Sequence, residues 1–321
     1  MRFLITGGAG FLGSHLTDAL LERGDEVTIL DAASDLKIRH QLGNPRFRYV
    51  RDSVLNREIL EGLISWCDVV YHLAAVVGVE HYVGDPYQVL NVNVNGTQTV
   101  LSVAFKARKK VIFSSTSEVY GKSRSVPFTE DGDRVLGSTR IDRWCYSTSK
   151  AVGEHFCFAF HKLGLPVVVL RYFNVYGPRL DRMDVGRVIT IFLGQLMRGV
   201  PLTIIGDGRQ TRSFTYVDDA IQATVAAGLK EEAVGNIINI GSDEEVSIKQ
   251  LAEKMISLYG SPSTITFVPQ ESIYGASYED IPRRVPDNSR MREILGVVPQ
   301  VSLKDGLKRT IEWFRARGIE G

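Results

Sequence analysis

The sequence has few cysteines, and their spacing does not suit a disulfide framework or a metal site. Its three cysteines, Cys67, Cys145 and Cys157, form no CxxC pair, and the histidines show no cluster at metal-ligand spacing. Secreted disulfide scaffolds and structural zinc sites depend on such patterns. We therefore expect reduced thiols, no metal and a cytoplasmic location.

The sequence also lacks an excess of charge and long hydrophobic runs. Lysine and arginine together number 38 against 37 acidic residues, which leaves a formal net charge of +1. This balance does not favour nucleic acid or a membrane surface as a partner. No apolar run approaches the roughly 20 residues that a membrane helix needs. The chain begins with a strand-like segment, RFLIT, where a signal peptide would begin with basic residues and an apolar region.

What the sequence does contain is an alternation of short apolar runs with helical patterns in its first half. The runs are apolar throughout, as expected for parallel strands that are covered on both faces. The pattern predicts an α/β fold with a doubly wound parallel sheet of the Rossmann type. The expected strands are residues 2–6, 26–31, 46–50, 68–74, 109–115 and 166–172, and the long expected helices are 87–106 and 146–163.

Beyond Asn174 the segments become shorter and turns more frequent. Strands are expected at 201–205, 236–241 and 264–268, and helices at 247–259 and 303–316. Ser247 is a plausible N-cap for the first of these helices. We expect a nucleotide-binding domain over 1–174, to which some later segments return, and a smaller α/β substrate-binding domain over 175–321, with a cleft between the two.

A glycine pattern links the first expected strand to the first helix. Gly7, Gly10 and Gly13 give the spacing GxxGxxG in TGGAGFLG. Small residues at this position let the backbone approach a pyrophosphate, and the helix N-terminus offers free N–H groups to it. Asp31 ends the second expected strand, where a carboxylate can bind an adenosine ribose and would repel a 2′-phosphate. The pattern predicts NAD as the cofactor, in preference to NADP.

A second constellation is YSTSK, in which Tyr146 and Lys150 share one face of a helix. An unperturbed phenol has a pKa of about 10, so it is a poor base at neutral pH. A neighbouring ammonium and an oxidised nicotinamide would both lower that pKa. The tyrosine could then take a proton from a substrate hydroxyl while hydride leaves the same carbon.

These segments resemble the extended short-chain dehydrogenase/reductases, a family of NAD-dependent nucleotide-sugar epimerases, dehydratases and decarboxylases. The resemblance covers nearly the whole chain. It rests on TGGAGFLGSHL, HLAA (72–75), NVNGT (93–97), SSTSEVYG, YSTSKAVGE (146–154), RYFNVYGPR (171–179), GDGRQTRSFTYVDD (206–219) and RRVPDNS (283–289). It implies an NAD that is reduced and reoxidised within one cycle, a UDP-sugar substrate and a homodimer formed by the two long helices.

The resemblance also implies roles for individual residues. The expected catalytic residues are Thr116, Ser117, Glu118, Tyr146 and Lys150. The expected cofactor contacts are Gly7, Gly10, Phe11, Leu12, Gly13, Asp31, Asp52, Ser53, Leu73, Ala74, Ala75, Ser114, Tyr146, Lys150 and Tyr172. The expected substrate contacts are Tyr82, Asn174, Arg182, Arg187, Val188, Arg212, Arg283 and Arg284. Arginines in this set suit a diphosphate, which they can bind in a bidentate manner.

Glu118, in STSEVYG directly after the fifth expected strand, bears on the type of reaction. The 4,6-dehydratases of the family carry an Asp-Glu pair here, but this chain has Ser117 in the first position, and a hydroxyl is a poor general acid near neutral pH. The 4-epimerases usually have no carboxylate in this stretch, whereas the UDP-glucuronate decarboxylases carry TSE as this chain does. Arg143 and Trp144, just before the catalytic tyrosine, also resemble the decarboxylases. We therefore expect oxidative decarboxylation of UDP-glucuronate to a UDP-pentose.

Several alternatives stay open at this stage. The arginine that meets the sugar carboxylate could be Arg182 or Arg283, and Arg182 with Asp184 also resembles a run in the glucuronate 4-epimerases. Epimerisation at C4 is therefore the second reading. A non-catalytic dinucleotide-binding protein is the third, although such relatives tend to lose the tyrosine or the lysine. Glu118 could also be a loop residue that faces solvent, and Ile205 stands where many relatives place an aromatic against the base.

Overall fold

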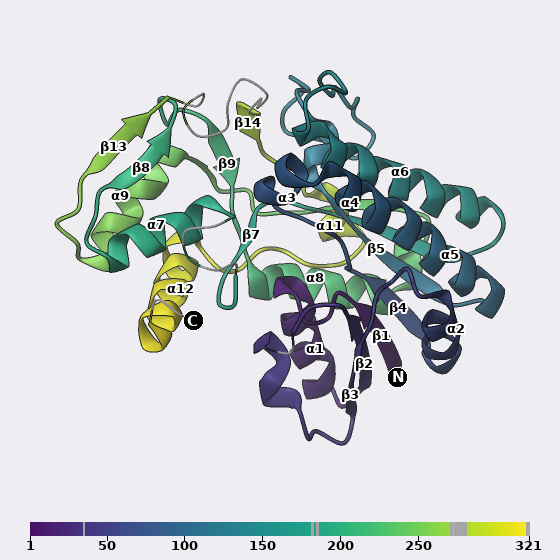
Figure 1. Ribbon diagram of the computed structural model, residues 1–321. Helices are drawn as coiled ribbons and strands as arrows, with labels where there is room; N and C mark the ends of the chain where they lie inside the picture. The colour runs from purple at the N-terminus through teal and green to yellow at the C-terminus, as the bar shows by residue number, and fades with distance from the viewer. Residues whose placement is uncertain (35, 181–182, 184–185, 270–271, 273–280, 319–321) are drawn as a thin grey trace.

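A seven-stranded parallel sheet forms the centre of the computed structural model, which describes residues 1–34, 36–180, 183, 186–269, 272 and 281–318 (Figure 1). The strand order is β11-β6-β5-β4-β1-β2-β3, and every neighbouring pair is parallel. The strands are β1 (Arg2–Thr6), β2 (Glu26–Asp31), β3 (Phe47–Arg51), β4 (Val69–His72), β5 (Lys110–Thr116), β6 (Val167–Tyr172) and β11 (Ile237–Ile240). The doubly wound fold expected from the sequence is confirmed.

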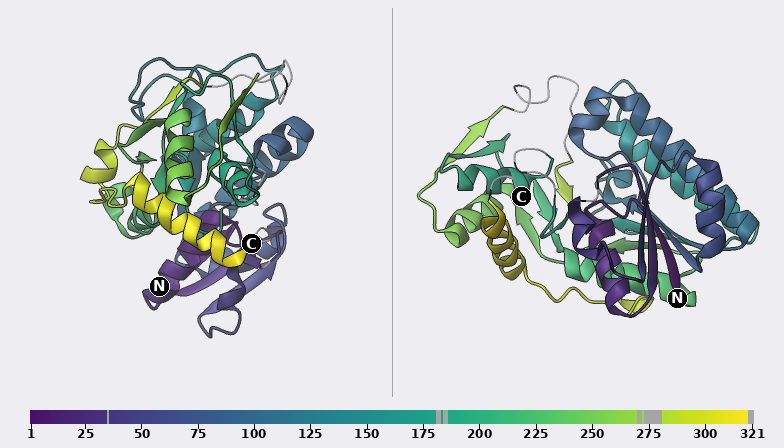
Figure 2. Two further views of the ribbon diagram at one scale, coloured as in Figure 1. Left: turned by 90° about the vertical axis from the view of Figure 1, so that its left-hand side faces the viewer. Right: turned by 60° about the horizontal axis from the view of Figure 1, so that its bottom comes forward.

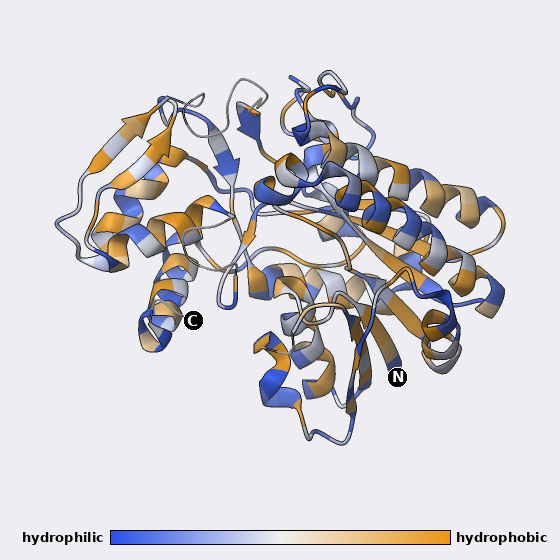
Figure 3. Cartoon of the chain, in the orientation of Figure 1, coloured by the Kyte–Doolittle hydropathy of each residue, from blue (hydrophilic) through white to orange (hydrophobic). Residues whose placement is uncertain are grey.

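Helices cover both faces of this sheet, which explains why its strands are apolar throughout (Figure 3). Phe3 and Ile5 of β1 pack toward α1 (Phe11–Glu22) and α8 (Val217–Leu229), while Leu4 packs toward the opposite face. On that opposite face lie α2 (Arg57–Trp66), α5 (Gly96–Ala107) and α6 (Arg143–Lys162). Alternate residues of one strand therefore enter two separate cores.

The long helix expected over residues 87–106 is built from three consecutive helical pieces. They are α4 (Pro86–Leu90), the π-helical turn η2 (Asn91–Asn95) and α5. A short helix, α3 (Val79–Gly84), precedes them. Two further short helices are η1 (Leu36–Gln41), after β2, and η3 (Ser117–Tyr120), directly after β5.

The later part of the chain forms a second lobe and also returns to the sheet (Figure 1). Strands β8 (Leu202–Ile205) and β13 (Ile265–Val268) pair with each other, and β9 (Thr211–Ser213) lies between β12 (Glu245–Ser247) and β14 (Arg283–Arg284). Helices α7 (Val188–Met197), α9 (Ile248–Tyr259) and α12 (Leu303–Arg317) belong to this lobe, with α12 packed beside α9 (Figure 2). The remaining described elements are β7 (Val175–Tyr176), β10 (Thr215–Tyr216), η4 (Glu231–Ala233) and α11 (Ser289–Glu293).

All the strands and helices expected beyond Asn174 are present, but they divide between the two parts. The segment expected as a strand at 236–241 is β11, which joins the central sheet beside β6, and α8 covers a face of that sheet. Ser247 caps α9 with a complete capping box, since its hydroxyl accepts from the N–H of Gln250 and the Gln250 side chain accepts from the N–H of Ser247. Among the described helices, none is long and apolar enough to cross a membrane.

Candidate active site

A cavity of about 1050 Å³ lies where the carboxyl ends of the sheet strands meet the second lobe. In doubly wound folds, ligands bind at this edge of the sheet. The lining includes Gly7, Gly10, Phe11, Leu12, Gly13, Asp31, Asp52, Ser53, Leu73, Ala74, Ala75, Tyr82, Ser114, Thr116, Ser117, Glu118, Tyr146, Lys150, Tyr172, Asn174, Arg187, Val188, Arg212 and Arg284. The structure thus brings to one cavity nearly all the residues that the sequence singled out. Of the others, Arg182 lies outside the described residues, and Arg283 does not line the cavity.

The glycine loop between β1 and α1 forms one end of the cavity, and its glycines are required by close backbone approaches. Gly7 has a φ of +75°, and a Cβ there would lie 2.6 Å from the backbone nitrogen of Ala74. A Cβ on Gly13 would lie 2.2 Å from the carbonyl oxygen of Gly7. The N-cap residue of α1, Gly10, places no side chain over the helix N-terminus. The first N–H groups of this helix are therefore available to a pyrophosphate.

Two carboxylates stand beside this loop in fixed orientations. Asp31 accepts hydrogen bonds from the backbone N–H groups of Ala9 and Ala33, both at 2.9 Å. Asp52 accepts from the N–H of its neighbour Ser53 at 2.7 Å and from the Asn56 amide at 3.0 Å. Asp31 at the end of β2 suits a ribose diol, and the loop suits a pyrophosphate, so the residues present fit NAD.

Tyr146 and Lys150 project from α6 toward the carboxyl end of β5. Tyr146 stacks against Tyr82 with 6.0 Å between ring centroids, and both side chains are buried. The Lys150 ammonium donates to the carbonyl oxygen of Ser114 at 2.7 Å. Thr116 accepts from the N–H of Glu118 at 3.2 Å, which leaves the proton of its hydroxyl to hydrogen-bond Tyr146. The phenol, the hydroxyl and the ammonium that the sequence predicted thus converge at one strand end.

Burial is the main influence on the pKa values of Tyr146 and Lys150. Burial raises the pKa of Tyr146, as does the nearby charge of Glu118, while Arg187 and the Thr116 hydroxyl act in the opposite direction. Burial lowers the pKa of Lys150 to about 8. The sequence led us to expect a lowered pKa for Tyr146, but the surroundings that the protein itself provides raise it. Activation of the phenol therefore needs a further positive charge close to the ring.

Glu118 is a mostly buried carboxylate, with 14% of its side chain exposed, between two arginines. Its Oε1 accepts from Nη1 of Arg284 at 3.0 Å and from Nη2 of Arg143 at 3.4 Å. Burial opposes ionisation, but Arg143 and Arg284 outweigh it and lower the pKa of Glu118. Its Oε2 is also buried and accepts no hydrogen bond from any residue that the structure describes. The solvent-facing alternative for Glu118 is thereby excluded, and the carboxylate keeps one acceptor oxygen for a water or a substrate group.

Arg284 and Arg283 are neighbours on β14 but serve different surroundings. Arg284 donates its Nη2 to Oδ1 of Asn174 at 2.8 Å, and Asn174 in turn donates to the carbonyl oxygen of Ser213 at 2.8 Å. Arg283 is half-exposed and makes a bidentate contact with Glu245 at 2.7 and 2.8 Å. Successive strand residues point to opposite sides, so only one of the two arginines reaches the cavity.

At the far end of the cavity, the edge of β8 that does not pair with β13 is bordered by two amide side chains. The N–H of Leu202 donates to the backbone of the β13 segment. The backbone groups of the alternate residues, Thr203 and Ile205, therefore point away from β13, and both residues line the cavity. The Gln195 side chain accepts from the N–H of Thr203, and the Gln210 side chain donates to the carbonyl oxygen of Ile205, both at 3.0 Å. Backbone groups and amides in this arrangement can recognise the polar edge of a nucleotide base.

Two residues near the reacting groups had no place among the expected site residues. Arg143, at the first position of α6, is almost fully buried beside Glu118. Asn93 is a buried residue of η2, and its amide pairs with both backbone groups of Val76 and donates to the Ser149 hydroxyl. An arginine before the YxxxK motif and the NVNGT segment were the only signals in the sequence. Neither reveals a contact with a residue distant in the chain.

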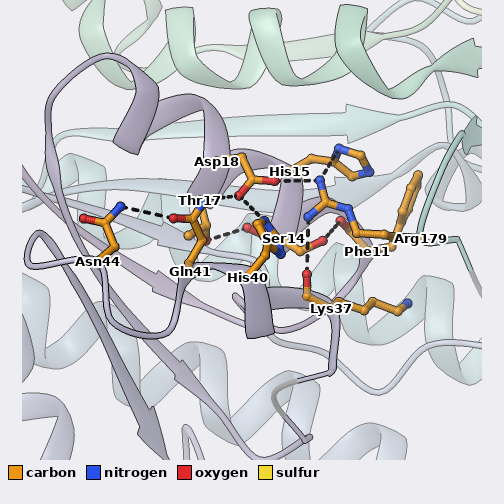
Figure 4. A network of polar contacts seen from close by, with 11 residues as sticks. Phe11, Ser14, His15, Thr17, Asp18, Lys37, His40, Gln41, Asn44 and Arg179 are labelled. Carbon is orange, nitrogen blue, oxygen red and sulfur yellow. Dashed lines mark hydrogen bonds and ion pairs between the residues drawn. The ribbon is translucent and has the colours of Figure 1, made fainter.

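A polar network joins α1 and η1 to the turn at residues 178–180, which leads into the second lobe (Figure 4). His15 contacts the carbonyl oxygen of Pro178 at 2.8 Å, and Nη2 of Arg179 lies 2.8 Å from its other ring nitrogen. Arg179 also donates to Asp18 at 2.7 Å. Because guanidinium groups can only donate, Nδ1 of His15 accepts and Nε2 carries the proton. Burial and Arg179 accordingly lower the pKa of His15 to about 4.

Comparison with known proteins identifies the family of this chain. Residues 3–241 match the model of the NAD dependent epimerase/dehydratase family. A UDP-N-acetyl-alpha-D-glucosaminuronate decarboxylase from Bacillus cytotoxicus is 44% identical over 98% of each chain. UDP-glucuronic acid decarboxylase 1 of Xenopus tropicalis is 37% identical over 98% of this chain and 72% of its own length. A crystal structure of UDP-glucuronic acid 4-epimerase from Bacillus cereus, in complex with UDP-glucuronic acid and NAD, superposes with a TM-score of 0.89 at 34% identity, covering 99% of this chain and 100% of the other.

Proposed function

The chain belongs to the NAD dependent epimerase/dehydratase family, and from this premise we propose that it is an NAD-dependent decarboxylase of a UDP-uronic acid. The substrate is UDP-glucuronate or its 2-acetamido counterpart, UDP-N-acetylglucosaminuronate. These are the substrates after which the two decarboxylase relatives are named. The observation that carries the proposal is the buried Glu118 carboxylate, which Arg284 and Arg143 hold beside Tyr146. Loss of CO2 from a sugar requires that a proton be delivered where the carboxylate was.

The charges that line the cavity support a substrate with more negative charge than a neutral UDP-hexose. Away from the glycine loop, the cations of Arg143, Arg187, Arg212 and Arg284 outnumber the carboxylates of Glu80 and Glu118 in the lining. A UDP-uronate brings a diphosphate and one further carboxylate. Arginine is suited to both groups because its planar fork binds oxyanions in a bidentate manner.

The first task of the protein is to remove the proton of the C4 hydroxyl. When bound, NAD supplies the oxidation of C4 to a ketone and its later reduction, and it places a positive charge beside the phenol. Tyr146 accepts the hydroxyl proton as the phenolate, and the Thr116 hydroxyl can donate to that oxygen. Lys150, fixed by Ser114, adds positive charge from the same helix face.

The ketone at C4 makes the sugar a β-keto acid, from which CO2 can leave. The bond between C5 and the carboxylate carbon breaks, and its electron pair passes into the C4–C5 enolate while CO2 departs. Until C5 is protonated the enolate can recapture CO2, so the proton that adds to C5 governs the net release of CO2. The ketone is then reduced back to the alcohol as Tyr146 returns its proton to the C4 oxygen. Because the pKa of Glu118 is lowered, the group is a carboxylate and has no proton of its own to give. Its Oε2 can hold and orient a water that protonates C5, and the hydroxide that remains takes up a proton from solvent.

Epimerisation at C4 is the second candidate, supported by the similarity to the Bacillus cereus epimerase. Inverting C4 requires the keto-sugar to turn over with its carboxylate intact, and no step in that reaction needs a proton donor at C5. The Glu118 site would then have no chemical role. For this reason we favour decarboxylation.

Incubation of the purified protein with UDP-glucuronate, and separately with UDP-N-acetylglucosaminuronate, tests the proposal. Mass spectrometry and NMR of the products distinguish the outcomes. A UDP-pentose that has lost the mass of CO2 supports decarboxylation and identifies the preferred C2 substituent. A product of unchanged mass with inverted C4 would establish the epimerase and exclude the decarboxylase.

The setting of this activity is also part of the proposal. Residues 175–321 supply most of the sugar-binding wall, and residues 1–174 hold NAD. The protein acts in the cytoplasm, in keeping with its unpaired cysteines Cys67, Cys145 and Cys157. Two copies pair through α5 and α6, whose outer faces expose Phe105 and partly expose Phe160.

A further inference from the structure

Asn239, in β11, is a fully buried side chain at which three separate segments meet. Its Oδ1 accepts from the hydroxyl of Tyr120 at 2.7 Å. Its Nδ2 donates to the carbonyl oxygens of Phe128 at 2.8 Å and Asp287 at 3.2 Å. One amide therefore satisfies polar groups at residues 120, 128 and 287, each of which is distant from Asn239 in sequence.

Two of these stretches lead to Glu118, which we place at C5 of the sugar, and to its partner Arg284. Tyr120 ends the η3 turn that contains Glu118, and Asp287 follows three residues after Arg284. The third stretch pairs directly with the segment after Arg284. Phe128 donates its N–H to the carbonyl oxygen of Val285 at 2.8 Å, and its own carbonyl oxygen accepts from the N–H of Asp287 at 2.9 Å. Glu118 and Arg284 are thus connected twice, once by their own contact and once through the Asn239 junction.

Tight packing around the junction leaves little room for adjustment. The rings of Tyr120 and Phe128 stack with centroids 4.6 Å apart. A Cβ added to Gly241, two residues after Asn239, would lie 2.5 Å from the ring of Pro286 and 3.2 Å from Cβ of Phe173. The segment that follows β14 therefore approaches the end of β11 more closely than any other residue at position 241 would permit.

We infer that Asn239 is a positioning residue which, through the Tyr120 hydroxyl and the 284–287 segment, sets the geometry of Glu118 against Arg284 for proton delivery to C5. The inference rests on the proposed function. The oxidation at C4 depends on Tyr146 and Lys150 of α6, and Lys150 is fixed by a separate contact with Ser114. Loosening the junction should therefore slow CO2 loss and C5 protonation more than it slows oxidation, since small displacements of a reacting group are costly in rate.

The Tyr120→Phe variant tests this, with Tyr71→Phe as its matched control. Both remove one buried phenolic hydroxyl, but Tyr71 donates to the carbonyl oxygen of Val225, away from the cavity lining. In single-turnover experiments with the uronate that the wild type converts, the absorbance of the reduced nicotinamide reports oxidation, and CO2 release reports decarboxylation. For Tyr120→Phe we expect oxidation within about twofold of the wild type, CO2 release slowed about tenfold and persistent reduced cofactor. Affinity for UDP alone, measured by calorimetry, should stay within about twofold in both variants.

Asn239→Asp gives a second and stronger perturbation. It keeps the shape but places an acceptor oxygen against the Phe128 and Asp287 carbonyl oxygens, and we expect CO2 release to slow about 100-fold. If this variant does not fold, Tyr120→Phe decides the matter alone. CO2 release within about twofold of Tyr71→Phe, or oxidation and CO2 release slowed equally, would overturn the inference and leave the proposed function intact. A wild type that releases no CO2 from either uronate would overturn both.

Discussion

At the scale of single residues, the charge of Glu118 is the feature on which decarboxylation depends. Replacing it in Glu118→Gln keeps an acceptor for Arg284 but removes the negative charge. We expect kcat for CO2 release to fall about 10²- to 10³-fold, a typical range for loss of a general acid–base group. The control is Glu245→Gln, which removes a carboxylate bound to Arg283 outside the cavity. Equal rates of CO2 release in the two variants would show that Glu118 does not act at C5.

His15 makes stability depend on pH. Its folded-state pKa of about 4 lies below its ordinary value of 6.5, so the unfolded chain takes up the proton first as the pH falls. The stability that neutral His15 contributes is fully present above pH 6.5 and is lost as the pH falls toward 4. From pH 7.5 to 5 the loss amounts to about 2 kcal/mol.

Urea unfolding at these two pH values measures this contribution. In His15→Gln the difference between the two pH values should be smaller than in the wild type by about 2 kcal/mol. Burial also lowers the pKa of His72, to about 3, so a part of the acid sensitivity persists in the variant. An unchanged difference would mean that the Arg179 contact does not fix the neutral form of His15.

At the scale of elements, the start of α1 tolerates no side chain at Gly13. A Cβ there would lie 2.2 Å from the carbonyl oxygen of Gly7. Because both atoms are fixed by the backbone, no change of side-chain rotamer can relieve this clash. Gly13→Ala should reduce the NAD content of the purified protein and lower its melting temperature. In the control Gly62→Ala, on α2, nothing lies within 4 Å of the new methyl group. That variant should keep its NAD and be unchanged or more stable by up to about 1 kcal/mol, and a similar loss of NAD in both would contradict the steric argument.

The capping box of α9 offers a second test at this scale. Ser247→Ala removes the side-chain acceptor of the Gln250 N–H and should lower the free energy of unfolding by about 1 kcal/mol without changing kcat. Ser257, an exposed serine of the same helix, is the matched control. Its replacement by alanine should be neutral or slightly stabilising, because alanine has the higher helix propensity. Equal effects at both positions, measured by urea unfolding, would show that the cap does not stabilise this helix.

At the scale of the whole molecule, the uncovered face of α5 and α6 is the surface through which two copies should pair. Phe105 is 36% exposed, and its ring centroid lies 5.7 Å from that of Phe160 on the neighbouring helix. A double variant, Phe105→Glu with Phe160→Glu, should be monomeric by light scattering, since it places charge in an isologous interface. Phe267→Glu changes a phenylalanine of β13 in the other lobe that is 48% exposed, and it should keep the wild-type mass. A monomeric wild type at micromolar concentration would exclude the dimer.

The cavity is also a property of the whole molecule. It takes its nucleotide loop from the first residues of the chain and Arg284 from near the end. The network of His15, Asp18 and Arg179 ties α1 to the turn at residues 178–180, which leads into the second lobe (Figure 4). Neither part alone contains the full set of groups that the reaction needs.

The sequence by itself determined what depends on local pattern. Apolar runs bounded by helical periodicity predicted the parallel sheet, because strands buried on both faces have no polar side. The glycine spacing at Gly7, Gly10 and Gly13 and the four-residue spacing of Tyr146 and Lys150 predicted the two ligand-facing elements, because each pattern lies within one turn or helix. Glu118 was recognised because it lies two residues after the end of β5.

Only the tertiary structure decided the contacts between distant segments. Glu118 meets Arg143 across 25 residues and Arg284 across 166, and no periodicity encodes such separations. Arg283 and Arg284 look equivalent in sequence, but the pairing of β14 with β9 turns one toward Glu245 and the other into the cavity. The same holds for β11, which reads as part of the later half and yet completes the central sheet, because strand partners are chosen by packing across the whole molecule.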